Sequence, residues 1–180
     1  MYLLQQGAPG ESRSDPENAV YRFLARLSIP FFRIDHEPVH TMEDCQAIDR
    51  ALGGEICKNL FLCNTQKTRF YLLMIREDKS FITRDVSRQL GVSRLTFGPP
   101  EEMEKLLHLS PGAVSPMGLL FESARDVQLI IDEDIKKADQ LGCHPCVNTA
   151  SIRLAMDDFF NRFLPAAGHA PVFVNIPEQS

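Results

Sequence analysis

The sequence predicts one α/β domain in which helices surround a mixed β-sheet. Segments with strand character and segments with helix character alternate irregularly, and both short hairpin turns and longer crossovers connect them. The 180 residues are 44% hydrophobic and 24% charged with a mean hydropathy of −0.15, which is typical of one globular core. No internal repeat or linker divides the chain. We therefore expect a flexible segment over residues 1–14 and a single domain over residues 15–180.

Helices are predicted where apolar residues recur at helical spacing between a capping or proline start and a glycine or proline end. These stretches are residues 16–29, 42–52, 83–90, 99–109 and 156–164. Asp15 is the expected cap of the first helix, and Thr41 is the expected cap of the second. A shorter helical turn is expected at "DEDIKKA".

Strands are predicted where β-branched, aromatic and aliphatic residues cluster between turn residues. These stretches are residues 31–37, 55–63, 70–75, 94–97, 127–131, 146–154 and 171–176. The run "FYLLMI" is apolar at every position, which indicates a central strand covered on both faces.

The composition excludes several classes of protein. No apolar run approaches the roughly 20 residues of a membrane helix, and the N-terminal residues lack the basic and apolar segments of a secretion signal. Five cysteines at irregular spacing do not form a secreted disulfide framework. A net charge of −5 argues against extended, sequence-blind binding to DNA or RNA. We expect a cytoplasmic protein with reduced thiols, no membrane contact and no DNA partner.

The charge is nevertheless uneven along the chain. Between residues 67 and 94 there are seven basic and three acidic side chains, a local charge of +4. Such a run is usually a solvated face, and the alternative is a small docking site for one RNA end. Lys67, Arg84 and Arg88 are the candidate contacts in the second interpretation.

Lys58 and Asn59 interrupt the otherwise apolar strand "EICKNLFLC". An ammonium group that leaves water needs a partner, because desolvation of a charge is unfavourable. Lys58 therefore either extends along a sheet edge toward water or lines a cleft for an anionic or carbonyl ligand, and the sequence leaves both open. Asn59 offers a donor and an acceptor, which suits the orientation of a water molecule or an amine.

The segment "SPGAVSPMG" is predicted to be a stiff loop. Gly112 permits backbone conformations closed to other residues, and Pro116 restricts the chain after it. Such a loop can direct N–H groups at a ligand oxygen, although most loops of this composition are ordinary turns.

The segment "GCHPCVNTAS" contains three residues of metal-binding type, Cys143, His144 and Cys146. The other cysteines provide no second C-x-x-C pair, so we predict neither a metal nor another cofactor. His144 is then either tied to the backbone or part of a pocket wall. Asn148 and Thr149 face opposite sides of the strand expected there.

Familiar catalytic motifs are absent from the sequence. His36 and His40 flank Glu37, but Pro38 interrupts any helix and so excludes the helical zinc-protease motif. No nucleophile elbow, Walker loop or dinucleotide fingerprint occurs. Any chemistry is expected to act through positioning and electrostatics.

Five segments in order resemble the YbaK/prolyl-tRNA-synthetase-associated domain family: "HEPVHT", "CKNLFL", "PGAVSPMGL", "IIDEDI" and "GCHPCVNTAS". The resemblance spans residues 17–176, and the "KN" pair and "HPCVNTAS" are most similar to the branch that hydrolyses alanyl-tRNA(Pro). The resemblance implies a barrel-like mixed sheet wrapped by helices and a hydrolase that clears mischarged tRNA released by the synthetase. It implies the acceptor end of tRNA(Pro) carrying a small amino acid as substrate, with room for a transient contact to prolyl-tRNA synthetase.

The resemblance also assigns roles to residues of this chain. It places Lys58, Asn59 and Gly112 in catalysis, and His144, Ser115, Pro116, Asn148 and Thr149 in substrate binding. Lys58 would hold the terminal phosphate or ribose, Asn59 would orient the water or the amine, and the 2′-hydroxyl of the tRNA could assist. The thiols beside His144 replace bulkier apolar residues of relatives, so the amino acid removed stays open. The alternatives are a deacylase for cysteinyl-tRNA(Pro) or another small aminoacyl-tRNA, and a non-catalytic binding module.

Overall fold

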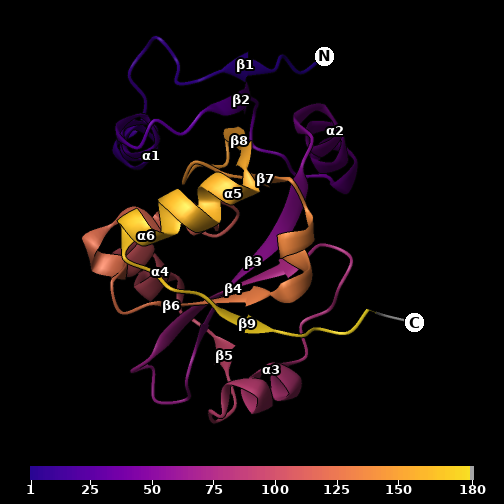
Figure 1. The fold of residues 1–180 in the computed structure, drawn as a ribbon, viewed down its shortest axis with the longest axis vertical. Coiled ribbons are helices and arrows are strands. Elements are labelled where there is room, and N and C mark those ends of the chain that lie inside the picture. Colours follow the sequence, from indigo (N-terminus) through magenta and orange to yellow (C-terminus); the bar gives the residue numbers. More distant parts are fainter. Residues whose placement is uncertain (179–180) are drawn as a thin grey trace.

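The computed structural model describes residues 1–178 as a nine-stranded mixed sheet with helices around it (Figure 1). The strands are β1 (Gln5–Gln6), β2 (Phe31–Asp35), β3 (Glu55–Cys63), β4 (Phe70–Arg76), β5 (Thr96–Phe97), β6 (Gln128–Asp132), β7 (Gln140–Cys143), β8 (Ala150–Ala155) and β9 (Val172–Val174). The helices are α1 (Asp15–Arg26), α2 (Met42–Leu52), α3 (Thr83–Leu90), α4 (Pro100–Leu107), α5 (Met156–Asp158) and α6 (Leu164–Ala167). Shorter turns are η1 (Pro116–Leu120), η2 (Glu122–Ala124), η3 (Glu133–Lys137) and the π-helical turn η4 (Phe159–Phe163). The predicted α/β class is confirmed.

The order of the strands creates a junction in the middle of the sheet. The pairings run β1-β2-β8-β7-β3-β4-β6-β9, with β5 paired to β3 outside this path. The strands β3 and β7 are parallel and pair only through Glu55 with Leu141 and Ile56 with Gly142. Beyond this point β3 continues along β4 while β7 continues along β8. The two halves of the sheet therefore separate at residue 57, and the space between them holds the candidate site.

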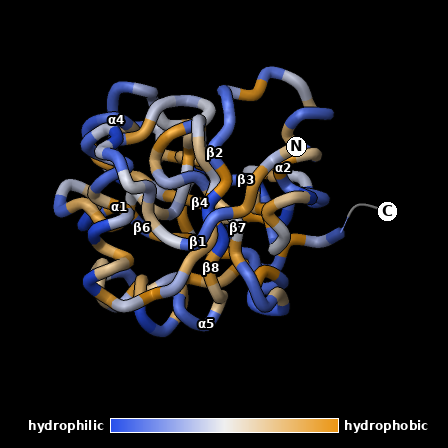
Figure 2. The backbone as a smooth tube through the Cα atoms, turned by 90° about the horizontal axis from the view of Figure 1, so that it is seen from above, coloured by the Kyte–Doolittle hydropathy of each residue, from blue (hydrophilic) through white to orange (hydrophobic). Residues whose placement is uncertain are grey.

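Two hydrophobic clusters cover the two faces of β4. Leu72 and Met74 belong to the larger cluster, whereas Tyr71, Leu73 and Ile75 belong to the smaller one. The prediction of a central strand covered on both faces is confirmed. Hydrophobic stretches gather on the inner strands in Figure 2, and hydrophilic stretches lie mostly on the outer loops.

Helix boundaries follow local chemistry. Thr41 caps α2 by accepting a 3.1 Å hydrogen bond from the backbone N–H of Asp44, as predicted. Gly91 ends α3 in the left-handed conformation, with φ of +66°. At α1 the cap is Ser14 rather than Asp15, because Asp15 already has helical geometry and places its carboxylate in the first turn.

The N-terminal segment contains a short strand that its composition does not predict, and the flexibility of residues 1–14 stays a prediction. Gln5 and Gln6 form β1, which pairs antiparallel with β2. Arg33, only 2% exposed, donates to the carbonyl of Gly7 and to the side chain of Gln5 at 3.0 Å. A buried arginine on the neighbouring strand therefore holds a segment whose own composition carries no strand signal.

The strand predicted over residues 146–154 is shorter than expected and is preceded by another strand. Residues 144–149 form a loop in which Cys146 has φ of +63°, a conformation that no regular strand contains. β8 begins only at Ala150, and β7 occupies Gln140–Cys143. The sequence "QLGC" is too short and too glycine-containing to register as a strand.

A buried ion pair connects the turn after β4 with the end of β6. Lys79 is fully buried, and its ammonium lies 3.0 Å from Asp132 and 2.6 Å from Asp134. Hydrogen bonds from Lys137 and from Lys79 lower the pKa of Asp134 to about 2. Across residues 1–178, no helix is long and apolar enough to cross a membrane.

Candidate functional site

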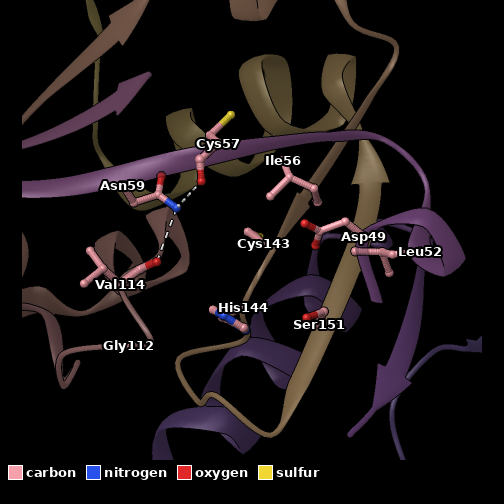
Figure 3. A pocket seen from close by; sticks show the side chains of 11 residues that line it. Asp49, Leu52, Ile56, Cys57, Asn59, Gly112, Val114, Cys143, His144 and Ser151 are labelled. Carbon is pink, nitrogen blue, oxygen red and sulfur yellow. Dashed lines mark hydrogen bonds between the residues drawn. The ribbon is translucent and has the colours of Figure 1, made fainter. Parts of the chain in front are cut away.

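A cavity of about 300 Å³ opens where β3 and β7 separate (Figure 3). Its lining comes from five parts of the chain: Asp49 and Leu52 of α2; Ile56, Cys57 and Asn59 of β3; Gly112 and Val114 of the loop; Gly142, Cys143 and His144; and Ser151 of β8. The cavity thus draws together the "KN" strand, the predicted stiff loop and the histidine segment, which lie far apart in the sequence.

One end of the cavity is apolar and tightly packed. A Cβ atom on Gly142 would lie 2.2 Å from Cδ1 of Ile56 and 3.1 Å from Cδ2 of Leu52. These two side chains therefore occupy the space that a side chain at residue 142 would fill. Ile56 and Leu52 set the depth of this end.

Asn59 joins β3 to the loop over residues 110–118. Its Nδ2 donates to the carbonyl of Val114 at 3.2 Å and to that of Cys57 at 3.5 Å. Its Oδ1 is buried and has no hydrogen-bond partner within residues 1–178. The amide N–H groups are therefore engaged by the backbone, and the group that Asn59 leaves for a ligand is an acceptor.

Gly112 lies in the wall of the cavity with φ of +90°, so the predicted conformational role of this glycine is confirmed. In the described part of the chain its backbone N–H makes no hydrogen bond. This donor is available to a ligand oxygen.

His144 is held as a neutral imidazole with a defined tautomer. Its Nδ1 lies 2.8 Å from the carbonyl oxygen of Ala150, and a carbonyl only accepts, so Nδ1 carries the proton. Burial lowers the pKa of His144 below its ordinary value, the bond to Ala150 opposes this shift, and His36 adds to it. Nε2 consequently presents a lone pair at neutral pH. Ser115 fixes the segment by donating to the carbonyl of His144 at 2.6 Å.

His36 and Ser151 form a second polar pair, which the sequence analysis missed. Nδ1 of His36 lies 2.9 Å from the carbonyl of Glu37, which fixes its proton there, and Nε2 accepts from Oγ of Ser151 at 3.0 Å. The antiparallel pairing of β2 and β8 brings them together, because Ile34 lies opposite Ser151. In the sequence, His36 is marked by its spacing to His40, which suggests a metal motif, and by the segment "HEPVHT", but neither feature pairs it with Ser151.

Asp49 is the second feature that the sequence analysis missed. It lies on α2, and its carboxylate points into the cavity (Figure 3). Burial and, to a smaller extent, Glu77 raise the pKa of Asp49 to about 6, although His36 and Arg50 act to lower it. In the sequence Asp49 is one of several acidic residues on an amphipathic helix, so nothing there distinguishes it.

The structure places Lys58 outside the cavity lining. Its side chain is exposed, lies on the face of β3 opposite Cys57 and Asn59, and donates through Nζ to the backbone carbonyl of Lys79. Of the two interpretations of Lys58, this geometry agrees with a side chain that extends along the sheet edge and keeps its ammonium group in water, not with one that lines a cleft. Any contact of Lys58 with a ligand lies outside the cavity.

Four of the residues assigned to substrate binding do not line the cavity. Ser115 and Pro116 are buried behind it, where Ser115 supports His144 and Pro116 begins η1. Asn148 is exposed, and Thr149 offers its carbonyl to the backbone N–H of His36. The chain forms a loop rather than a strand at Asn148 and Thr149, so the two side chains do not alternate between two faces of a sheet.

The thiols near His144 are buried and protonated. Burial raises the pKa of Cys143 to about 12, and burial likewise raises the pKa of Cys146. Among residues 1–178, no group of three or more histidine, cysteine or acidic side chains is arranged to hold a metal ion. The absence of a metal remains a prediction.

The basic run is smaller in the structure than in the sequence. Lys79 is neutralised in its buried pair, and Arg76 lies within 3.6 Å of Glu55 and 2.8 Å of Asp78. Arg84 and Arg88 on α3 remain 83% and 71% exposed, and Lys67 is exposed in the turn before β4.

These features define the class of protein. The cavity combines a neutral histidine, buried acceptors, a free backbone donor and a carboxylate, which suits an activated ester and a water molecule. Residues 36–161 match the aminoacyl-tRNA editing domain family. The chain belongs to this family, and its enzymatic class is aminoacyl-tRNA deacylase.

Individual proteins are similar over most of the chain. The prolyl-tRNA editing protein ProX of Acetoanaerobium sticklandii is 31% identical over 144 residues, which cover 80% of this chain and 88% of that protein. The prolyl-tRNA synthetase associated domain-containing protein 1 of Danio rerio is 30% identical over 170 residues, 93% of this chain and 89% of that protein. A crystal structure described as a candidate trans-editing enzyme for prolyl-tRNA synthetase has a TM-score of 0.67 at 17% identity, covering 93% of this chain and all of that one. The predicted family and fold are thus confirmed.

Proposed function

We propose that this protein hydrolyses alanyl-tRNA(Pro) after the mischarged tRNA has left prolyl-tRNA synthetase. The names of the similar proteins support tRNA(Pro) as the substrate tRNA, because they refer to editing of prolyl-tRNA or to prolyl-tRNA synthetase. The observation that supports alanine as the amino acid removed is the short apolar end of the cavity, where Ile56 and Leu52 pack against Gly142. About 300 Å³ must hold the ester and its surroundings as well as the side chain, so a methyl group fits this end better than a pyrrolidine ring.

The proposed reaction needs no acyl-enzyme, because the aminoacyl ester is already activated. Oδ1 of Asn59 and the Nε2 lone pair of His144 are acceptors that can hold the attacking water, with the tRNA 2′-hydroxyl as a second candidate to assist. The free N–H of Gly112 can donate to the ester oxygen on which negative charge develops. Water adds to the carbonyl carbon, the bond to the ribose oxygen breaks, and that oxygen takes up a proton.

Lys58 and α3 supply the proposed contacts outside the cavity. The ammonium of Lys58 is proposed to contact the phosphate or ribose of the terminal adenosine, and the exposure of this side chain supports the proposal. Arg84 and Arg88 are proposed to contact the acceptor stem, and their exposure on α3 supports the proposal. Reversing both arginines to glutamate should weaken substrate capture and reduce the salt slope by about one for each phosphate that is no longer neutralised, with little change in turnover at saturation. The matched control is Arg125→Glu, which reverses an exposed arginine on another element; an unchanged slope in the α3 variant would mean a merely solvated face.

The central experiment measures loss of the ester from tRNA(Pro) charged with alanine, cysteine, serine or proline. We expect rapid release of alanine and almost none of proline. Preferential release of cysteine would assign the alternative substrate, binding without release would indicate a binding module, and equal release of alanine and proline would refute the editing assignment.

A variant of the apolar end tests the size argument directly. Ile56→Ala removes the side chain that limits the depth of this end, so hydrolysis of the prolyl ester should rise by about 10-fold or more. Leu60→Ala is the control, because it shortens a side chain on the same strand that does not line the cavity. A prolyl ester that stays resistant in Ile56→Ala would show that this wall does not set selectivity.

A further inference from the structure

Asp49 is the one acidic residue in the cavity lining, as far as residues 1–178 are concerned. It lies in the last turn of α2, is half-buried, and directs its carboxylate into the cavity from the side opposite Asn59 and Val114 (Figure 3). Within the described chain it forms neither a hydrogen bond through its carboxylate nor an ion pair. A charged group therefore faces the cavity with its binding capacity unused.

The surroundings of Asp49 do not favour a carboxylate. Burial removes water from it, Glu77 is a nearby like charge, and the C-terminal end of a helix carries partial negative charge. His36 and Arg50 act in the opposite direction, but neither forms an ion pair with it. The result is a pKa raised to about 6, so the group is mainly ionised at neutral pH and lacks a partner. Such unfavourable placement beside a cavity is typical of a ligand-binding group.

The ligand that fits this group is a cation small enough to share the cavity with an ester. An aminoacyl ester carries one such cation, its α-ammonium group, and α-amino groups have an ordinary pKa of about 7.7 to 8.0. Above the pKa of Asp49 and below that of the amine, both partners are charged. The other polar groups of the lining, Asn59, Ser151 and neutral His144, carry no charge that competes for it.

We propose that Asp49 binds the α-ammonium group of the aminoacyl ester and thereby selects esters with a free amine. The inference rests on the proposed deacylase function and specifies how the substrate is oriented. With the ammonium on the α2 side, the ester carbonyl turns toward the loop that contains Gly112. Esters whose amine is acylated, or replaced by a hydroxyl, cannot form this ion pair.

The test compares two esters that differ in charge but hardly in size. Alanyl-tRNA(Pro) carries the α-ammonium group, and lactyl-tRNA(Pro) carries a hydroxyl in its place. Wild-type protein should hydrolyse the alanyl ester more efficiently, and Asp49→Asn should lose about 10- to 100-fold in kcat/KM on it while changing little on the lactyl ester. The intrinsic reactivities of the two esters are the same for both proteins. The change in the alanyl-to-lactyl ratio of kcat/KM between wild type and Asp49→Asn therefore measures the contact between Asp49 and the ammonium group.

Two further measurements separate binding from structural damage. Asp49→Asn should melt at or above the wild-type temperature, since it removes a poorly solvated charge. Glu43→Gln is the matched control, because it neutralises an exposed carboxylate on the same helix and should leave the ratio unchanged.

Each outcome decides the proposal. Equal losses on both esters, or an unaltered alanyl rate in Asp49→Asn, would overturn the role of Asp49 while leaving the deacylase function intact. If wild-type protein hydrolyses neither ester, the proposed function fails instead. Binding of 3′-alanylamino-adenosine then still tests Asp49: tighter binding than the lactylamino analogue, abolished in Asp49→Asn, supports the ion pair, and equal binding overturns it.

Discussion

Replacement of Lys58 by methionine separates a structural lysine from one that meets the substrate. The side chain is exposed, and its hydrogen bond within the described chain goes from Nζ to the carbonyl of Lys79. Methionine keeps an unbranched apolar stem on the strand. Loss of this partly buried hydrogen bond from a charged donor costs about 1.5 to 3 kcal/mol, or about 3 to 12 °C in melting temperature for a chain of this length. The fold should therefore survive the change.

The effect on activity should be large if the ammonium contacts the tRNA. A charge-assisted contact is worth about 1.5 to 3 kcal/mol, which corresponds to a loss of about 10- to 100-fold in kcat/KM on alanyl-tRNA(Pro). Because Lys58 lies outside the cavity, the loss should fall mainly on substrate capture. Turnover at saturating tRNA should stay close to the wild-type value.

The assay is deacylation of alanyl-tRNA(Pro) over a range of concentrations, measured together with thermal unfolding. Lys58→Arg should retain most activity because it preserves the charge. Lys105→Met, at an exposed lysine of α4, controls for a general loss of positive charge. A stable Lys58→Met protein with full kcat/KM would refute the proposed contact and leave Lys58 as a solvated edge residue.

Three other predictions concern the buried ion pair of Lys79, the pH response of deacylation and the absence of a metal. Lys79→Met leaves the buried carboxylate of Asp132 with backbone N–H donors but without its counter-ion, and should cost about 3 to 5 kcal/mol, or about 6 to 20 °C in melting temperature. Adding Asp132→Leu should recover most of this loss, and an unchanged melting temperature in the single variant would contradict the prediction. Because burial depresses the pKa of His144, its neutral form persists below the ordinary value of 6.5, and deacylation corrected for spontaneous hydrolysis should fall as the pH drops through that lowered pKa. Asp49, with a pKa of about 6, titrates in the same pH range, so the Asp49→Asn variant is needed to isolate the effect of His144. Deacylation by this variant should still fall as the pH drops, and a rate that does not change with pH would argue against His144. Chelators should leave deacylation unchanged, and one zinc ion per chain by elemental analysis would overturn the prediction of no metal.

Most secondary structure followed from local chemistry. A few neighbouring residues are enough to predict the cap at Thr41, the helix end at Gly91 and the apolar strand β4. Elements stabilised from elsewhere were missed. β1 depends on the buried guanidinium of Arg33, and β7 depends on its pairing with β3 and β8.

The sequence by itself determined the family, the glycine at residue 112 and the importance of the segments around Asn59 and His144, because each is a pattern of residue types at fixed spacing. Only the tertiary structure decided which side chains of those segments reach the cavity. It directs Lys58 away, places Ser115 behind His144, and brings Asp49 and Ser151 into the lining. The physical reason is that the cavity arises where β3 and β7 separate, and neither the register of two strands about 85 residues apart nor the packing of α2 against them is encoded in any local pattern.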